Sequence, residues 1–305
     1  MPELPDVELY RETLTRLLAG RPLLGVRLGS PFLLRSVDPP LATVAGKTVR
    51  ELRRLGKRIV IALDDDLHLV IHLMIAGRFQ WKDPGAKLPR RLGQAAFDFD
   101  HGTLLLTEAG TKKRASLHVV RGEEGLAPFD RGGLEVLDAG ADEFAAALTS
   151  ENHTVKRALT DPRILSGIGN AYSDEILHRA RMSPFKRTAD LSAQEVRRLY
   201  GAARAVLVEW VERLRAQTGD GFPTKVTAFR PEMAVHGKHG EPCPACGAPV
   251  QRIVYAENEA NYCAGCQTGG RVLADRALSR LLRDDWPRTL EELEERLPGR
   301  SRPTP

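Results

Sequence analysis

All four cysteines of the chain lie within one short segment in its C-terminal quarter. Cys243 and Cys246 form one C-x-x-C pair, and Cys263 and Cys266 form a second pair after sixteen intervening residues. Four thiolates at this spacing are typical of one tetrahedral Zn²⁺ ion held between two tight turns, whereas four unrelated buried thiols would not be paired in this way. Because protein fills all four positions, the predicted zinc is structural, and its binding supplies most of the folding free energy of so small a module.

A second motif that could bind a ligand is GIGN at 167–170, which stands directly before a predicted helix. Glycines at a helix start let backbone N–H groups approach an anion, and the helix dipole also favours negative charge there. Gly169 therefore predicts a close backbone approach, Asn170 adds a side-chain donor, and Lys156 adds a positive charge. DNA phosphate is a natural ligand for this set. The alternative is a plain turn between helices, with glycines kept for packing.

The elements that position these motifs differ between the two halves of the chain. Apolar residues at three- and four-residue spacing predict a helix over 4–18, which Gly20 ends. Short segments rich in Val, Ile, Leu or Phe then predict strands, and turn signals such as His101-Gly102 separate several of them. The predicted strands cover 24–28, 48–54, 58–63, 67–74, 95–99 and 103–107. Residues 1–135 are thus expected to form a β-sandwich or flattened barrel with a helix packed on it.

The pattern becomes helical after about residue 140. A short helix ends near Thr160, and the capping-box pair Ser192 and Glu195 opens a long helix that continues through about residue 216. Residues 218–242 contain several Gly and Pro residues and are interpreted as a connector. The expected organisation is a helical domain over 140–230, the zinc module over 235–270, and a helical extension with a disordered tail over 271–305.

Composition narrows the class of protein. The chain has 305 residues, enough for about two domains, with 42% apolar residues, a net charge of +5 and a pI of about 9.1. The basic excess is compatible with a nucleic-acid partner, although a solvated face would explain it equally well. The chain lacks the roughly 18 consecutive apolar residues of a spanning helix. Acidic residues at positions 3, 6 and 8 argue against a signal peptide, so a cytosolic protein is expected.

The combination of motifs resembles the formamidopyrimidine-DNA glycosylase/endonuclease VIII family, which comprises bifunctional base-excision repair enzymes. The resemblance covers about residues 1–268 and is carried by PELPDVE at 2–8, LGKR at 55–58, the stretch 154–184 and the cysteine hairpin. It implies an α+β multidomain fold with an N-terminal β-sandwich and helix, a helix-two-turn-helix domain and a C-terminal zinc-ribbon hairpin. It also implies a monomer in the bacterial cytosol or nucleoid, acting on double-stranded DNA with damaged or abasic sites.

The resemblance assigns chemistry to the start of the chain. Removal of Met1 would expose the secondary amine of Pro2, which matches the nucleophile of the family. An α-amino group has a pKa of about 8, so part of it is neutral near pH 7, unlike a lysine at about 10.4. Glu3 matches the catalytic acid, Lys57 matches a lysine that contacts phosphate, and Asp6 stands where the family usually has Glu. The implied reaction is a Schiff base at C1′ followed by β- or β/δ-elimination.

Four further positions depart from the family pattern. The family inserts a wedge of Met, Arg and Phe into the base stack that the extruded nucleotide leaves. Here Ile75 stands where the Met is usual, and Lys113 and Arg114 replace the usual Arg and Phe. Asn258 stands where the tip of the zinc hairpin usually has an Arg that clamps phosphate. Lysine lacks the planar fork with which Arg distinguishes the base opposite the lesion.

We therefore hypothesise an active DNA glycosylase/AP lyase with an atypical choice of lesion. Three alternatives remain open at this point. The first is an endonuclease-VIII-like preference for oxidised pyrimidines, or a preference for bulky or crosslinked bases. The second is a non-catalytic damaged-DNA binding protein on the same scaffold. The third is a zinc-ribbon transcription or processing factor in which Pro2 has no role.

Overall fold

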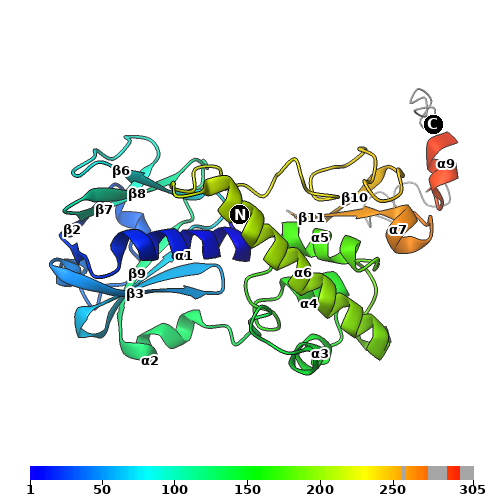
Figure 1. Cartoon of the computed structure of the whole chain (residues 1–305), viewed down its shortest axis with the longest axis horizontal. Coiled ribbons are helices and arrows are strands. Elements are labelled where there is room, and N and C mark those ends of the chain that lie inside the picture. The colour runs from blue at the N-terminus through cyan, green and yellow to red at the C-terminus, as the bar shows by residue number, and fades with distance from the viewer. Residues whose placement is uncertain (256–257, 274–286, 296–305) are drawn as a thin grey trace. The chain divides into compact units, whose positions relative to one another are not determined.

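The computed structural model describes residues 1–255, 258–273 and 287–295 (Figure 1). Their contacts divide the chain into two compact units. Unit 1 comprises Met1–Ala139, Asp161–Ile168 and Leu207–Ala228. Unit 2 comprises Gly140–Thr160, Gly169–Val206 and the described residues from Phe229 onward. The chain thus enters and leaves each unit more than once, and the expected boundaries near residues 135 and 230 divide it differently.

Unit 1 contains two antiparallel sheets. The five-stranded sheet has the order β1-β3-β4-β5-β9, and the four-stranded sheet has the order β2-β7-β8-β6. The strands are β1 (Pro22–Leu23), β2 (Gly25–Leu28), β3 (Lys47–Leu55), β4 (Arg58–Leu63), β5 (Leu67–His72), β6 (Gly77–Lys82), β7 (Gly93–Phe99), β8 (Gly102–Glu108) and β9 (Ser116–Arg121). The unit also holds α1 (Leu4–Leu18), the short α2 (Gly122–Leu126) and single 3-10 turns at Pro31–Leu33, Leu41–Val44, Asp64–Asp66 and Ala127–Phe129.

One apolar core joins α1 to both sheets. The inward residues of β4 and β5 from one sheet and of β7 and β8 from the other belong to the same buried cluster as the apolar face of α1. Tyr10 of α1 meets Phe79 of β6 edge to face, with ring centroids 5.3 Å apart, and its hydroxyl accepts the Phe79 N–H at 3.3 Å. Burial of this shared surface is the main force that holds α1 in place.

The sequence predicted most strands of unit 1 and missed several short or less apolar elements. The helix over 4–18 and the strand over 58–63 are confirmed, and the strand predicted over 24–28 corresponds to β2, while β1 lies before it and was not predicted. The strands β6 and β9 were not predicted. In β6, GRFQWK alternates buried and half-buried residues and ends on the exposed Lys82, so it lacks the continuous apolar run that marks a strand such as β4.

Unit 2 is helical apart from one hairpin. Its helices are α3 (Ala141–Thr149), α4 (Val155–Thr160), α5 (Asn170–Arg179), the first part of α6 (Ala193–Thr218), α7 (Ala264–Thr268) and α9 (Leu290–Glu295), with a 3-10 turn at Thr188–Asp190. The hairpin pairs β10 (Val250–Tyr255) with β11 (Asn258–Cys263). The predicted capping box is confirmed, because the Ser192 N–H donates to Glu195 and the Glu195 N–H donates to the Ser192 hydroxyl.

The connector predicted over 218–242 contains no helix or named strand beyond Thr218, the last residue of α6. Most of the predicted helical extension lies outside the described residues. Its described part is the segment 287–295, which includes α9, together with residues 271–273. Within the part of the chain that the structure describes, no helix is long and apolar enough to cross a bilayer.

A hydrogen bond to a distant turn fixes the start of α1. The Leu4 N–H donates to the carbonyl oxygen of Gly167 at 2.9 Å. Gly167 has φ +80, a left-handed conformation that side chains rarely adopt, and a Cβ built on it would lie 2.9 Å from the Leu4 Cβ. Gly167 therefore serves two purposes: it turns the chain, and it lets the turn approach α1.

We predict that Gly167→Ala loosens the start of α1. Alanine costs roughly 1–2 kcal/mol in the left-handed region, and here its methyl group also presses on Leu4. Hydrogen exchange should therefore show faster exchange of the Leu4 amide, with a lowered thermal midpoint.

The matched control is Gly132→Ala, also in unit 1, where φ is +73 and no atom lies within 4 Å of the added Cβ. This variant should lose stability without faster exchange at Leu4. Equal exchange at Leu4 in the two variants would contradict the prediction.

Candidate functional site

The segment before α1 is buried rather than frayed. Pro2 is buried, and Glu3 is 3% exposed as the N-cap residue of α1. The Glu3 N–H donates to Oδ2 of Asp6 at 3.0 Å, and Asp6 is 1% exposed. This carboxylate satisfies a backbone donor that the helix itself leaves open, and its negative charge suits the first turn. The predicted nucleophile, acid and second carboxylate thus lie together on one short, fixed segment.

Four charged side chains surround the amino end of the chain. Burial lowers the pKa of the Met1 amino group. Among the charges, Glu3 and Asp6 raise this pKa, while Arg78 and Lys57 lower it further. The net direction is downward, so an amine in this position is neutral to a greater extent near pH 7 than a free α-amino group.

Lys57 lies in the turn between β3 and β4. Gly56, with φ +60, reverses the chain directly before it. Burial lowers the pKa of Lys57, and the nearby Glu3 carboxylate opposes this shift. The sequence motif LGKR is thereby brought close to Glu3, although the two are far apart along the chain.

Arg78 is a charged neighbour of the amino end that the sequence analysis missed. It lies on β6, and its guanidinium donates to the carbonyl oxygens of Ile75, Gly77 and Val226. The alternation of GRFQWK places Arg78 on the face opposite to Phe79, which is the one sequence signal that bears on its direction.

Two neighbouring loops of unit 1 carry the predicted wedge residues. Ile75 follows Met74, which has φ +52, and is 52% exposed at the tip of the β5–β6 turn. The Ala109 N–H donates to the Ala76 carbonyl at 3.4 Å, so the β8–β9 loop lies beside this turn. Arg114 is exposed on that second loop.

A buried carboxylate organises the β8–β9 loop. Glu108 is 1% exposed and accepts the Arg114 N–H at 2.9 Å and the Ala115 N–H at 3.3 Å. The Lys113 ammonium donates to the Glu108 carbonyl oxygen, so this predicted DNA contact is directed toward its own loop. The structure therefore brings Ile75 and Arg114 to neighbouring exposed positions, and it gives Lys113 an internal partner.

The predicted phosphate-binding turn belongs in part to unit 2. Gly169 is the N-cap residue of α5, and Asn170 is its first residue and is half-buried. Lys156 on α4 is 5% exposed, and its ammonium lies 2.5 Å from Oδ1 of Asp174. Asn170 is accordingly available at the helix start, whereas the charge of Lys156 is neutralised inside the protein.

The tip of the zinc hairpin lies at the edge of the described residues. Asn258 begins β11 and pairs with Tyr255, but its side chain lies outside what the structure describes. On the same hairpin, Arg252 and Glu259 form an ion pair at 3.8 Å. Arg252 is therefore partnered by a carboxylate of its own hairpin.

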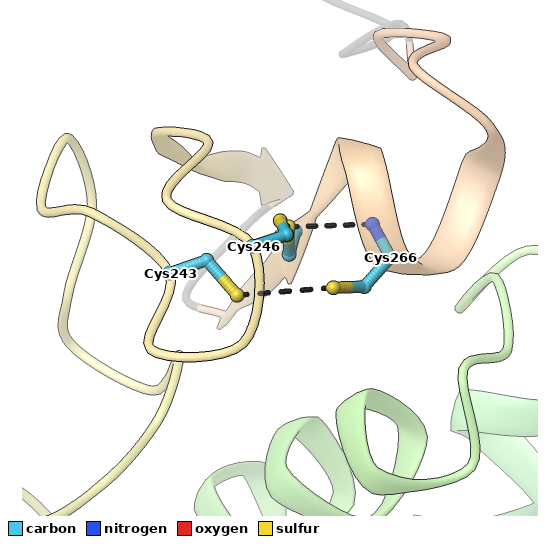
Figure 2. Close-up of side chains that lie close together, drawn as sticks. Cys243, Cys246 and Cys266 are labelled. Carbon is cyan, nitrogen blue, oxygen red and sulfur yellow. Dashed lines mark hydrogen bonds between the residues drawn. The ribbon is translucent and has the colours of Figure 1, made fainter. Parts of the chain in front are cut away.

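The four cysteines meet at one point, as the spacing predicted. Their sulfur atoms all lie within 4.8 Å of one another, and Figure 2 shows Cys243 facing Cys266. The Cys243–Cys266 sulfur distance is 3.9 Å, and the Cys246–Cys263 distance is 3.3 Å. A tetrahedral zinc with Zn–S bonds of about 2.3 Å needs sulfur atoms about 3.8 Å apart. The donor set and its spacing thus fit a structural zinc ion with four thiolate ligands.

His178 on α5 supports this cluster from outside. Its Nε2 lies 3.2 Å from Sγ of Cys243, and burial lowers its pKa, which favours the neutral ring. A neutral imidazole that donates to a ligating thiolate is a common outer partner of a metal site. Nothing in the cysteine motif itself pointed to this residue.

The comparison with known proteins covers the same regions. Residues 1–114 match the formamidopyrimidine-DNA glycosylase N-terminal domain, residues 135–220 match its H2TH domain, and residues 240–269 match a zinc finger found in FPG and IleRS. Formamidopyrimidine-DNA glycosylase of Thermus thermophilus is 36% identical over 280 residues, covering 88% of this chain and 100% of the relative.

Solved structures show the same likeness. The crystal structure of MutM (Fpg) from Thermus thermophilus superposes with a TM-score of 0.73 at 34% identity, covering 87% of this chain and 98% of that one. A Lactococcus lactis FPG mutant, solved with DNA containing Fapy-dG, superposes with a TM-score of 0.77 at 25% identity, covering 88% and 100%. The expected α+β fold, with its sheet domain, H2TH domain and zinc finger, is confirmed. The chain belongs to the formamidopyrimidine-DNA glycosylase family.

Proposed function

We propose that the protein is a bifunctional DNA glycosylase and AP lyase that uses the Pro2 amine as its nucleophile. The observation that carries this proposal is the buried start of α1, where Pro2 and Glu3 lie beside Asp6 and within electrostatic range of Lys57. A segment with only a structural role would gain nothing from an amine held among these groups. Family membership supports the glycosylase activity, and the local geometry supports the choice of nucleophile.

The proposed reaction begins when Met1 is removed and the Pro2 nitrogen becomes a secondary amine. Its lone pair forms a bond to C1′ as the bond from C1′ to the damaged base breaks. The base leaves with that bonding pair and takes up the proton that the nitrogen loses, so the nitrogen regains a lone pair. Glu3 then protonates the ring oxygen O4′, and the sugar opens to a cationic iminium. The iminium acidifies the C2′ proton, and loss of that proton expels the 3′ phosphate by β-elimination, with δ-elimination as a second step.

The environment favours this nucleophile on electrostatic grounds. Pro2 is buried, and burial disfavours the charged form of an amine. Lys57, placed near Glu3, is the cation proposed to contact the phosphate beside the lesion. Asp6 holds the Glu3 backbone, so its proposed role is to position the acid.

We propose double-stranded DNA with damaged or abasic sites as the ligand. The Lactococcus lactis relative was solved with Fapy-dG DNA, which supports a damaged duplex. At the start of α5, Gly169 and Asn170 are proposed to bind phosphate through backbone and side-chain donors. A monomer is sufficient for this arrangement, since each proposed residue comes from one chain.

We further propose that the choice of lesion is atypical. An enzyme that extrudes a nucleotide must fill the gap, at a cost of a few kcal/mol for unstacking. Here the exposed positions belong to Ile75 and Arg114, while the Lys113 ammonium is held by its own loop. A panel of duplexes with oxidised purines, oxidised pyrimidines and bulky or crosslinked bases distinguishes this proposal from standard 8-oxoguanine specificity and from a pyrimidine preference.

A non-catalytic damaged-DNA binding protein is the second candidate. The internal partner of Lys113 favours it, because a wedge with fewer free groups is less suited to opening the duplex. The buried Pro2 and Glu3, with the half-buried Lys57 near Glu3, argue against it, since binding alone needs no amine. Covalent trapping separates the two candidates.

We predict that borohydride traps the protein on abasic-site DNA through Pro2. Reduction of the iminium gives a stable covalent complex, and Pro2→Gly should abolish it. Denaturing electrophoresis measures the trapped fraction, and mass spectrometry of the wild type should show that Met1 is absent.

Pro22→Gly is the matched control, because it removes a proline ring at an exposed position of β1 without changing the terminal amine. It should trap like the wild type. Unchanged trapping by Pro2→Gly would overturn the assignment of the nucleophile.

We predict that the protein holds one zinc ion per chain and that Cys263→Ala loses both the metal and the affinity for abasic-site DNA. The metal supplies most of the folding free energy of the cysteine module, so its loss unfolds the hairpin. Atomic emission measures the zinc, and fluorescence anisotropy measures binding. Val254→Ala, at a 45% exposed position of the same hairpin, should retain both. A metal-free variant with full affinity would contradict the prediction.

A further inference from the structure

Asp174 of α5 is a buried carboxylate on which three other segments converge. It is 1% exposed. Its Oδ1 lies 2.5 Å from the Lys156 ammonium, and its Oδ2 lies 2.8 Å from Nδ1 of His236. Oδ2 also accepts a weaker hydrogen bond from Nδ2 of Asn261 at 3.4 Å. One side chain therefore links α5 to α4, to the connector before the cysteines, and to strand β11.

The Lys156 ammonium has no donor left for a ligand. Besides Asp174, it donates to the Ser173 hydroxyl at 3.0 Å and to the Asn170 carbonyl oxygen at 3.4 Å. An ammonium has three donors, and these three contacts use all of them. The Ser173 hydroxyl also donates to the Asn170 carbonyl at 2.9 Å. Lys156 thus holds the first turn of α5 in place through its hydrogen bonds to Asn170 and Ser173.

A cation in this place requires a compensating anion. The N-terminal end of a helix carries partial positive charge, so a buried ammonium beside the first turn is unfavourable without a counter-charge. Asp174, one turn further along α5, supplies that charge. Lys156 and Asp174 therefore act as one unit, and the position of Asn170 depends on both.

The same stretch of α5 also holds the zinc module. Glu175 accepts the backbone N–H groups of Ala234, Val235 and His236 at 2.8 to 2.9 Å. From the hairpin side, Nδ2 of Asn261 also donates to Glu259 at 3.0 Å. Asp174 and Glu175 together tie the connector and β11 to the helix whose first residue is Asn170.

We propose that Asp174 is a positioning residue for DNA binding. It fixes the Asn170 helix start and the zinc hairpin in one arrangement, and Lys156 acts through it rather than by contacting phosphate. This inference rests on the proposed function, in which the start of α5 binds DNA phosphate.

The test is the salt dependence of binding to a duplex with a stable abasic-site analogue, measured on the full zinc-loaded chain. Each phosphate contact made by a cation adds about 0.9 to the slope of log affinity against log salt concentration. Lys156→Met should weaken binding by roughly five- to thirtyfold, equivalent to 1–2 kcal/mol, with an unchanged slope. A slope that falls by about 0.9 would show a phosphate contact by Lys156 and overturn the proposal.

The double variant Lys156→Met with Asp174→Asn leaves no unpaired buried charge. It can therefore still be measured if a single variant misfolds. Its slope should equal that of the wild type. Its loss of affinity should be smaller than the sum of the two single losses, since the two residues act as a unit. Additive losses, or a reduced slope in the double variant, would overturn the proposal.

Strand-cleavage kinetics separate positioning from a general loss of stability. In Lys156→Met the DNA concentration for half-maximal rate should rise, while the rate at saturating DNA stays unchanged. A merely destabilised enzyme would show the opposite split, because fewer molecules would be active. Borohydride trapping of the wild type tests the proposed function separately, and a wild type that binds no duplex would overturn both proposals.

Discussion

The start of the chain is held in a single buried place, and the proposed role of the Pro2 amine depends on this constraint. Chain ends ordinarily fray because few contacts restrain them. Here the Leu4 N–H is bound by the Gly167 carbonyl, and the Glu3 N–H by the Asp6 carboxylate. These two bonds satisfy donors that a helix start leaves open. Burial also lowers the pKa of the Met1 amino group, so the packing that orders this end of the chain also favours a neutral amine there.

How much could be predicted from the sequence depends on how local each signal is. The helix over Leu4–Leu18 and the strand Arg58–Leu63 follow from periodicity within one segment, and the cysteine cluster follows from spacing that a tetrahedral metal imposes. The contact between Leu4 and Gly167, and the approach of Arg78 to the chain start, join residues distant in sequence. No local pattern encodes such a contact, because it forms only when the folded chain brings distant segments together.

Two lysines show a different limit of sequence analysis. Lys113 and Lys156 were predicted to meet DNA because of their charge and their place in motifs, yet both ammonium groups have partners inside the protein. The partners are the carbonyl oxygen of Glu108 and the carboxylate of Asp174, and neither is conspicuous in the sequence. A lysine in the sequence indicates a positive charge on a flexible side chain, whereas the group that pairs with this charge depends on the fold. Residues such as Ile75 and Arg114, which keep exposed positions, are therefore the better candidates for choosing the lesion.

The helices α1 and α5 use carboxylates in contrasting ways at their starts. In α1, Asp6 in the first turn accepts a backbone donor. In α5, Asp174 in the second turn neutralises a lysine that braces the first turn. A buried ion pair is often no more stabilising than apolar residues of the same volume, so stability alone does not explain its presence. An apolar pair, however, could not donate to the Asn170 carbonyl or accept from His236 and Asn261. The pair is therefore best explained by the geometry that it fixes, which connects the zinc hairpin to the residue that begins α5.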